Sequence, residues 1–118
     1  MLRIALAVVG GRDFSNYTLM CAKIDAIRAR CTVATLVSGG ARGADRLAER
    51  YARENELPIL VLRPDWSLGR GAGLLRNKEI VETADCVLAF WDGRSKGTKN
   101  TIERAEKSRK RVTVVRYK

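Results

Sequence analysis

A chain of 118 residues with 46% hydrophobic and 31% charged residues can bury a core, and we predict a single folded domain over residues 1–118. Its apolar runs are too short to span a membrane and no signal peptide is recognisable, so we expect a cytoplasmic protein without a membrane partner. The three scattered cysteines and the absence of histidine exclude a disulfide framework and the usual metal sites, so we expect no bound metal. The net charge of +10 favours phosphorylated or polyanionic partners, and any catalysis would have to use carboxylates, hydroxyls, arginine or bound water.

The predicted elements alternate between strands and helices. Residues 3–9 are almost all apolar, as in a central strand covered on both faces, and a helix follows that Ser15 or Asn16 could cap. Further strands are expected at residues 33–37, 57–62, 86–90 and 112–115. Further helices are expected from residue 44 to about 55, at about 74–83, and through residues 101–109. This order predicts an α/β fold, a doubly wound and mainly parallel five-stranded sheet with helices on both faces.

The turn after the second strand runs from Ser38 to Asp45 and reads Ser-Gly-Gly-Ala-Arg-Gly-Ala-Asp. Such a turn can bring backbone N–H groups and a helix N-terminus against a phosphate, and Arg42 adds a positive charge. The alternative is a connection that needs glycine only for close packing of helix and strand.

All ten glycines follow the predicted carboxyl ends of strands, and none lies where a helix leads into a strand. Because ligands bind at the carboxyl edge of an open α/β sheet, this distribution predicts a ligand site there. Arginines at this edge could clamp phosphate, Asp13, Asp45 or Asp92 could accept ribose hydroxyls, and Trp66 or Trp91 could stack a base. The candidate ligand-binding residues are Gly10, Gly11, Arg12, Asp13, Ser38, Gly39, Gly40, Arg42, Gly43, Asp45, Trp66, Arg76, Asn77, Asp92, Gly93, Ser95, Gly97 and Thr98.

Several of these residues also have purely structural interpretations. Asp45 and Thr98 could only cap their helices, and Trp91 ends an apolar strand and fits the core better than a binding site. The basic residues around Lys110 follow the last helix and could complement its dipole or form a solvated face.

The motif Ser-Gly-Gly-Ala-Arg-Gly-Ala-Asp followed by Leu-Ala-Glu resembles the signature of the SLOG superfamily, which joins the DNA-processing SMF/DprA proteins with the LOG phosphoribohydrolases. Three further stretches resemble its small YspA-like (YAcAr) branch, found in bacteria and their phages: residues 10–14, residues 72–77, and residues 89–93 with Ser95, Gly97, Thr98 and Thr101. The resemblance implies a Rossmann-like domain that binds a nucleotide or a nucleotide derivative. It is also compatible with a homo-oligomer, because relatives pair through helices that flank the sheet.

The resemblance bears on catalysis as well. LOG enzymes cleave the N-glycosidic bond of a nucleoside monophosphate with an arginine, matched here by Arg76, and with a glutamate after a Gly-Thr pair, matched here by Gly97-Thr98. Thr101 holds the glutamate position, and a threonine cannot replace a carboxylate in that chemistry. Glu103 would face another side of the helix. If the chain is an enzyme, its catalytic candidates are Arg76, Asp92 and Asp45.

Three functions remain open. The first is binding of a nucleotide-like small molecule as a sensor or sequestering module. The second is hydrolysis of a nucleoside monophosphate. The third is single-stranded DNA binding, for which only Trp66 and Tyr51 offer stacking side chains. The sequence leaves the cofactor unknown.

Overall fold

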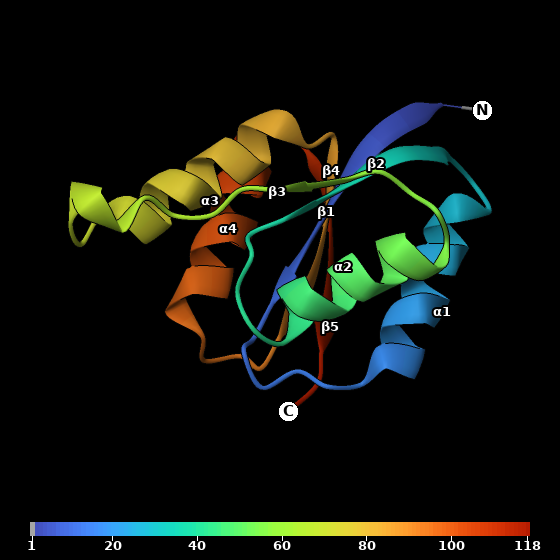
Figure 1. The fold of residues 1–118 in the computed structure, drawn as a ribbon, viewed down its shortest axis with the longest axis horizontal. Coiled ribbons are helices and arrows are strands. Elements are labelled where there is room, and N and C mark those ends of the chain that lie inside the picture. Colours follow the sequence, from blue (N-terminus) through green and yellow to red (C-terminus); the bar gives the residue numbers. More distant parts are fainter. Residues whose placement is uncertain (1) are drawn as a thin grey trace.

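The computed structural model describes residues 2–118, and within them five parallel strands form one sheet in the order β3-β2-β1-β4-β5 (Figure 1). This arrangement confirms the predicted α/β fold. The strands are β1 (Arg3–Gly10), β2 (Thr32–Ser38), β3 (Ile59–Val61), β4 (Cys86–Trp91) and β5 (Arg111–Arg116). The helices are α1 (Tyr17–Arg28), α2 (Ala44–Glu54), the short 3-10 turn η1 (Trp66–Leu68), α3 (Ala72–Thr83) and α4 (Lys96–Lys107).

Alternating side chains of the central strands supply two separate cores. Leu6 and Val8 of β1 pack with α1 and α2 on one face, whereas Ala7 and Val9 pack with α3 and α4 on the other. Figure 1 shows these helix pairs on opposite sides of the sheet. Because strand side chains alternate between faces, a strand covered on both sides must be apolar at nearly every position, as β1 and β4 are.

Three element boundaries differ from the predictions. Strand β3 is limited to Ile59–Val61, because it lies at the sheet edge and pairs only with β2. Helix α3 begins at Ala72, which is buried, so Gly73 lies inside the helix rather than in the preceding loop. Helix α4 begins at Lys96, five residues before the predicted start, because Ser95 caps it. At the other predicted boundaries the differences are small, and Asn16 caps α1 by accepting the N–H of Leu19 at 3.0 Å.

The helix-to-strand connections contain no glycine. Glu56 after α2 and Arg109 after α4 adopt the left-handed conformation that glycine often supplies there, with φ of 54° and 58°. The glycines of the chain are therefore concentrated near the carboxyl ends of the strands. In the described part of the chain, no helix is both long enough and apolar enough to cross a bilayer.

The strand order reverses between β1 and β4. From β1 the chain moves outward through β2 to β3, then returns to place β4 on the other side of β1. The carboxyl ends of these two strands meet with Gly10 opposite Phe90. A reversal of this kind leaves a crevice at the carboxyl edge, because the two flanking helices turn away from each other.

Candidate functional site

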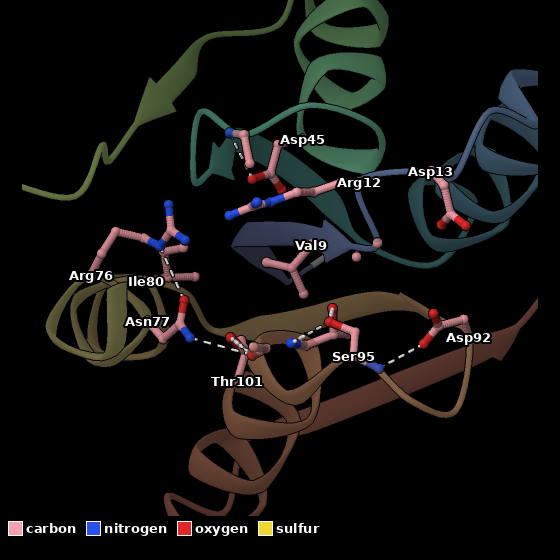
Figure 2. Close-up of a pocket in the computed structure, with 15 residues that line it drawn as sticks. Val9, Arg12, Asp13, Asp45, Arg76, Asn77, Ile80, Asp92, Ser95 and Thr101 are labelled. Atoms are coloured by element: carbon pink, nitrogen blue, oxygen red, sulfur yellow. Dashed lines mark hydrogen bonds between the residues drawn. The ribbon is translucent and has the colours of Figure 1, made fainter. Parts of the chain in front are cut away.

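A cavity of about 470 Å³ opens at this reversal point (Figure 2). Its walls come from the end of β1, the β2–α2 turn, the first turns of α3, and the β4–α4 turn. The lining residues are Val9, Gly10, Gly11, Arg12, Asp13, Ala41, Asp45, Arg76, Asn77, Ile80, Asp92, Ser95, Gly97, Thr98 and Thr101. Residues distant in sequence thus line one cavity, which is mostly polar and has Val9 and Ile80 as its apolar floor.

Two arginines from opposite walls converge on this cavity. In Figure 2 the guanidinium groups of Arg12 and Arg76 face each other across it. Arg76 is partly buried, and its Nε donates to Asn77 Oδ1 at 3.0 Å while its Nη1 donates to the carbonyl of Gly39. Burial lowers the pKa of Arg76; the carboxylate of Asp45 opposes that effect, and the like charge of Arg12 adds to it. An anion bound between the two guanidinium groups would relieve their repulsion.

Asp45 is a buried carboxyl in the wall of the same cavity. Its Oδ2 accepts the N–H of Ala41 at 3.0 Å, and only 5% of the residue is exposed. Burial raises the pKa of Asp45 to about 6, against the opposing effects of the Ala41 hydrogen bond and the positive charge of Arg76. Asp45 therefore titrates much closer to neutral pH than an ordinary aspartate, as groups in functional sites often do.

The glycine-rich β2–α2 turn donates fewer N–H groups to the cavity than its sequence predicts. The N–H of Gly40 donates to Ser38 Oγ at 3.1 Å, that of Ala41 to Asp45, and that of Ala44 to the carbonyl of Gly11 at 3.2 Å. These amides are already satisfied by the protein. We correct the expectation that they form a bare anion cradle, since the side chains Arg12 and Arg76 supply the positive charge here.

Close packing accounts for some of these glycines. Gly43 has φ of 72°, and a Cβ there would lie 2.3 Å from the carbonyl oxygen of Gly11. At Gly10 a Cβ would lie 2.5 Å from the carbonyl oxygen of Phe90. At Gly39 it would meet the guanidinium of Arg76 at 2.7 Å. The turn thus fits tightly against the β1–α1 loop and against Arg76 in the first turns of α3.

The β4–α4 turn presents a helix start to the cavity. Ser95, rather than Thr98, caps α4: its Oγ accepts the N–H of Thr98 at 3.3 Å. Asp92 Oδ1 accepts the N–H groups of Arg94 and Ser95, each at 2.8 Å, and these bonds lower its pKa. The N–H of Gly97 has no partner within its own helix, and a Cβ on Gly97 would meet nothing within 4 Å. A ligand can therefore approach this backbone closely.

Asp13 lies at the end of the cavity away from Arg76 (Figure 2). It accepts the hydroxyl of Tyr117 at 2.6 Å and pairs with Lys118. The ring of Tyr117 packs edge-on against Phe14. The segment after β5 thus holds the β1–α1 loop that carries Arg12.

A second cavity of about 480 Å³ adjoins the first and shares Arg12, Ala41, Arg76, Asn77 and Gly97 with it. Its other lining residues are Gly39, Gly40, Arg42, Arg46, Arg63, Pro64, Trp66 and Gly73. Arg63 donates from Nη1 to the carbonyl of Gly40 at 3.2 Å. Trp66 is 64% exposed. Arg42 therefore lies in this neighbouring cavity, while Arg12 and Arg76 border both.

Comparison with known proteins identifies the family. The model of the "YspA, cpYpsA-related SLOG family" matches residues 4–69, more than half of the chain. The chain belongs to this SLOG family. A phage relative, the "Gene 61 protein" of Mycobacterium phage D29, is 44% identical over an alignment of 80 residues that covers 62% of this chain and 64% of that protein.

Solved structures share the SLOG chain's fold. The DNA processing protein A (DprA) of Streptococcus pneumoniae superposes with a TM-score of 0.76 at 19% identity, over 97% of this chain and 50% of that one. The DNA processing protein A of Helicobacter pylori superposes with a TM-score of 0.69 at 21% identity, over 98% and 66%. The SLOG chain therefore spans half to two thirds of the length of these proteins, which show its fold.

Three of the candidate ligand-binding residues lie outside both cavities. Ser38 is fully buried and its Oγ bonds with Glu49 at 3.0 Å and with the N–H of Gly40. Gly43 packs against Gly11, and Gly93 has φ of 85° beside the guanidinium of Arg116. These three residues shape the turns and do not line the hollow themselves.

Two aromatic candidates also have structural roles. Trp91 packs with the core beside α4, and its indole N–H donates to the carbonyl of Ser95 at 3.1 Å. Tyr51 is 1% exposed and its hydroxyl donates to Asp25. We therefore withdraw Tyr51 as a stacking residue, which leaves Trp66 as the exposed ring beside the SLOG site.

Some lining residues were not among the candidate site residues. Thr101 lies in the cavity wall at the position where LOG enzymes carry glutamate, and its Oγ1 donates to the carbonyl of Gly97 at 3.3 Å. Glu103 is exposed and lines neither cavity, as its helical spacing predicts. The candidates also omit the apolar floor, Val9 and Ile80, and two further arginines, Arg46 and Arg63, because nothing in their local sequence marks them as lining residues. Ala41 lies inside the SLOG motif and Gly73 inside the matching stretch 72–77, but neither was a candidate, and Pro64 also lines the second cavity.

Proposed function

We propose that this SLOG protein binds a phosphorylated nucleotide or nucleotide derivative at the carboxyl edge of its sheet, as a sensor or a sequestering module. The observation that carries the proposal is the pair Arg12 and Arg76, which face each other across a cavity at the strand-order reversal. Two arginines aimed at one point are suited to a phosphate, because each guanidinium can donate two parallel hydrogen bonds to its oxygens.

The remaining walls suit the rest of a nucleotide. The N–H of Gly97 lies at the start of α4, where the helix dipole favours an anion. The hydroxyls of Ser95 and Thr98 and the carboxylate of Asp92 offer acceptors for sugar hydroxyls. Val9 and Ile80 provide an apolar floor for a ring.

A substitution at Gly97 tests this site without disturbing the fold. In Gly97→Val the new side chain enters open space at the rim of both cavities, and valine costs the helix no more than glycine does. We expect it to reduce binding of a nucleoside monophosphate by about tenfold or more, since a lost charge-assisted contact is worth about 1.5–3 kcal/mol. Isothermal calorimetry with the four common nucleoside monophosphates measures the effect.

Gly71→Val is the matched control. Gly71 also has open space around its Cβ position, but it lines neither cavity. The control should bind as the parent chain does. Equal affinity in the parent, Gly97→Val and Gly71→Val chains, or no binding of any nucleotide to the parent chain, contradicts the proposal.

Hydrolysis of a nucleoside monophosphate remains a second candidate because of Asp45. A buried carboxyl with a pKa of about 6, lying close to Arg76 in the same cavity, is suited to exchange a proton near neutral pH. Release of free base from a nucleotide panel, with a rate that falls on Asp45→Asn, would favour the enzyme. Absence of free base after long incubation at high protein concentration would exclude it for those substrates.

Single-stranded DNA binding is a third candidate, favoured by the net charge of +10 and by the likeness to the DNA processing protein A of Helicobacter pylori, which has a single-stranded DNA binding mode. The exposed aromatic surface for base stacking is small, since Trp66 is the one candidate ring that the structure leaves exposed beside the cavities.

A further inference from the structure

The two adjoining cavities differ sharply in charge. Among the described residues, the first is lined by Arg12 and Arg76 together with three carboxyl groups. The second is lined by those same two arginines and three more, and no carboxyl group is among its lining residues. One phosphate carries about two negative charges at neutral pH, so five arginines exceed what a single phosphate would neutralise.

The border between the cavities is formed by the groups best suited to hold phosphate. Arg12, Arg76 and Gly97 line both cavities, so a group placed between the two guanidinium groups touches both hollows. A chain of two phosphates centred there would continue toward Arg42 and Arg46. Neither of these exposed arginines is needed to neutralise a carboxylate within the second cavity.

The second cavity also offers an aromatic surface. Trp66 lies in η1, whose start is fixed by Asp65: its Oδ1 accepts the N–H of Ser67 at 3.1 Å and the hydroxyl of Ser67 at 2.6 Å. A Cβ added to Gly73 would lie 3.9 Å from the edge of the Trp66 ring, so that edge lies close to α3 while 64% of the residue stays exposed. An exposed indole beside a cluster of arginines can stack a nucleobase.

We propose that the ligand of this protein has two nucleoside units joined by a pyrophosphate, with one unit in each cavity and the phosphates between Arg12 and Arg76. This inference rests on the proposed function and deepens it. The carboxyl-lined cavity takes the unit whose sugar hydroxyls need acceptors, and the arginine-lined cavity takes the second phosphate charge and a base stacked on Trp66.

Three ligands of one base separate the contributions. The base is the one whose monophosphate binds tightest, and the ligands are its nucleoside monophosphate, its nucleoside diphosphate and its symmetric dinucleoside pyrophosphate. We expect affinity to rise from the first to the third, by about tenfold overall, from added charge-assisted hydrogen bonds and stacking. Calorimetry at constant ionic strength measures the three affinities.

Variants locate the gain in the second cavity. The double variant Arg42→Ala/Arg46→Ala should remove most of the gain while changing monophosphate affinity by less than about threefold, because these arginines line only the second cavity. Trp66→Ala should reduce binding of the dinucleoside pyrophosphate alone. Arg53→Ala/Lys107→Ala is the control, since it removes the same charge from two exposed helical positions outside both cavities.

The possible outcomes distinguish failure of this inference from failure of the proposed function. Binding of the monophosphate with no gain for the larger ligands overturns the inference and leaves the proposed function standing. The inference is also overturned if the Arg42→Ala/Arg46→Ala variant loses as much affinity for the monophosphate as for the dinucleoside pyrophosphate. It is overturned as well if the control variant loses as much affinity for the pyrophosphate as the Arg42→Ala/Arg46→Ala variant does. A single-stranded oligonucleotide that binds more tightly than the pyrophosphate replaces the inference with a nucleic-acid site. Failure of every nucleotide to bind overturns both.

Discussion

Asp45 shows how one residue of the turn combines structure with the candidate chemistry. Its carboxyl group satisfies the N–H of Ala41 and so holds the turn closed, yet it lies almost fully buried near Arg76. Burial of a carboxyl that ionises near neutral pH costs folding free energy. A protein that tolerates this cost at its main cavity resembles those in which stability is traded for a function of the site.

Replacing this carboxyl by an amide should increase stability at neutral pH. Folding raises the pKa of Asp45 from its ordinary 3.8 to about 6, so the folded state loses stability as pH rises from about 4 to about 6 and bears the full penalty above that range. Asp45→Asn keeps an acceptor for Ala41 and removes the titration. We expect a gain of about 1–3 kcal/mol in unfolding free energy at pH 7.5 and little change at pH 4.

Urea unfolding at the two pH values measures the effect of Asp45→Asn. Thr101→Val is a useful comparison, because it removes a buried hydroxyl of the same cavity that donates to the backbone carbonyl of Gly97, a group that does not titrate. Its stability loss should be similar at both pH values. A destabilised Asp45→Asn protein at pH 7.5 would show that the carboxylate stabilises the turn more than its burial costs.

At the scale of elements, helix α3 positions Arg76 and Asn77 in the candidate site. Lys110, between α4 and β5, anchors its far end: its Nζ donates to the carbonyls of Val81 at 2.5 Å, Ala84 at 2.6 Å and Glu82 at 3.3 Å. The sequence placed this lysine with α4. The structure shows that it instead caps the carboxyl end of α3, which complements the dipole of that helix.

Lys110→Met should destabilise the fold through α3. The substitution keeps the aliphatic stem and removes the charged donor, leaving carbonyl groups without their partner, and we expect a loss of about 2 kcal/mol in unfolding free energy. Lys107→Met, at an exposed position on α4, is the control and should change stability by less than about 0.5 kcal/mol. Urea unfolding followed by circular dichroism measures both. Equal effects of the two substitutions would contradict the capping role of Lys110.

At the scale of the whole molecule, charge and shape point to different ligands. The net charge of +10 would attract any polyanion, whereas the adjoining cavities of about 470 and 480 Å³ suit a compact molecule. The dependence of binding on salt distinguishes these cases, because each phosphate of a single strand that the protein neutralises adds about −0.7 to the slope of log K against log salt.

We expect a shallow salt dependence. A ligand with one or two phosphates should give a slope no steeper than about −2, whereas a ten-nucleotide strand held along the surface should give a slope steeper than about −3. Titrations of a nucleoside monophosphate and of such an oligonucleotide at several salt concentrations measure both slopes. A steep slope for the oligonucleotide, together with its displacement of the monophosphate, would favour the nucleic-acid function.

The sequence by itself determined the α/β fold, the family and the edge of the sheet where polar residues gather. These are local properties: strand and helix periods, glycine-bearing turns and one motif read along the chain. Arg12, Arg76, Asn77 and Gly97 could be named from them, because each is part of such a turn or helix start.

Only the tertiary structure decided which groups meet there. It showed that Ser38 and Asp45 accept the N–H groups of Gly40 and Ala41 in the glycine-rich turn, that Tyr51 is buried, and that Arg46 and Arg63 join Arg42 in a second cavity. Hydrogen-bond partners and burial depend on contacts between segments far apart in the chain. The order of the strands sets those contacts, and a local pattern carries no information about that order.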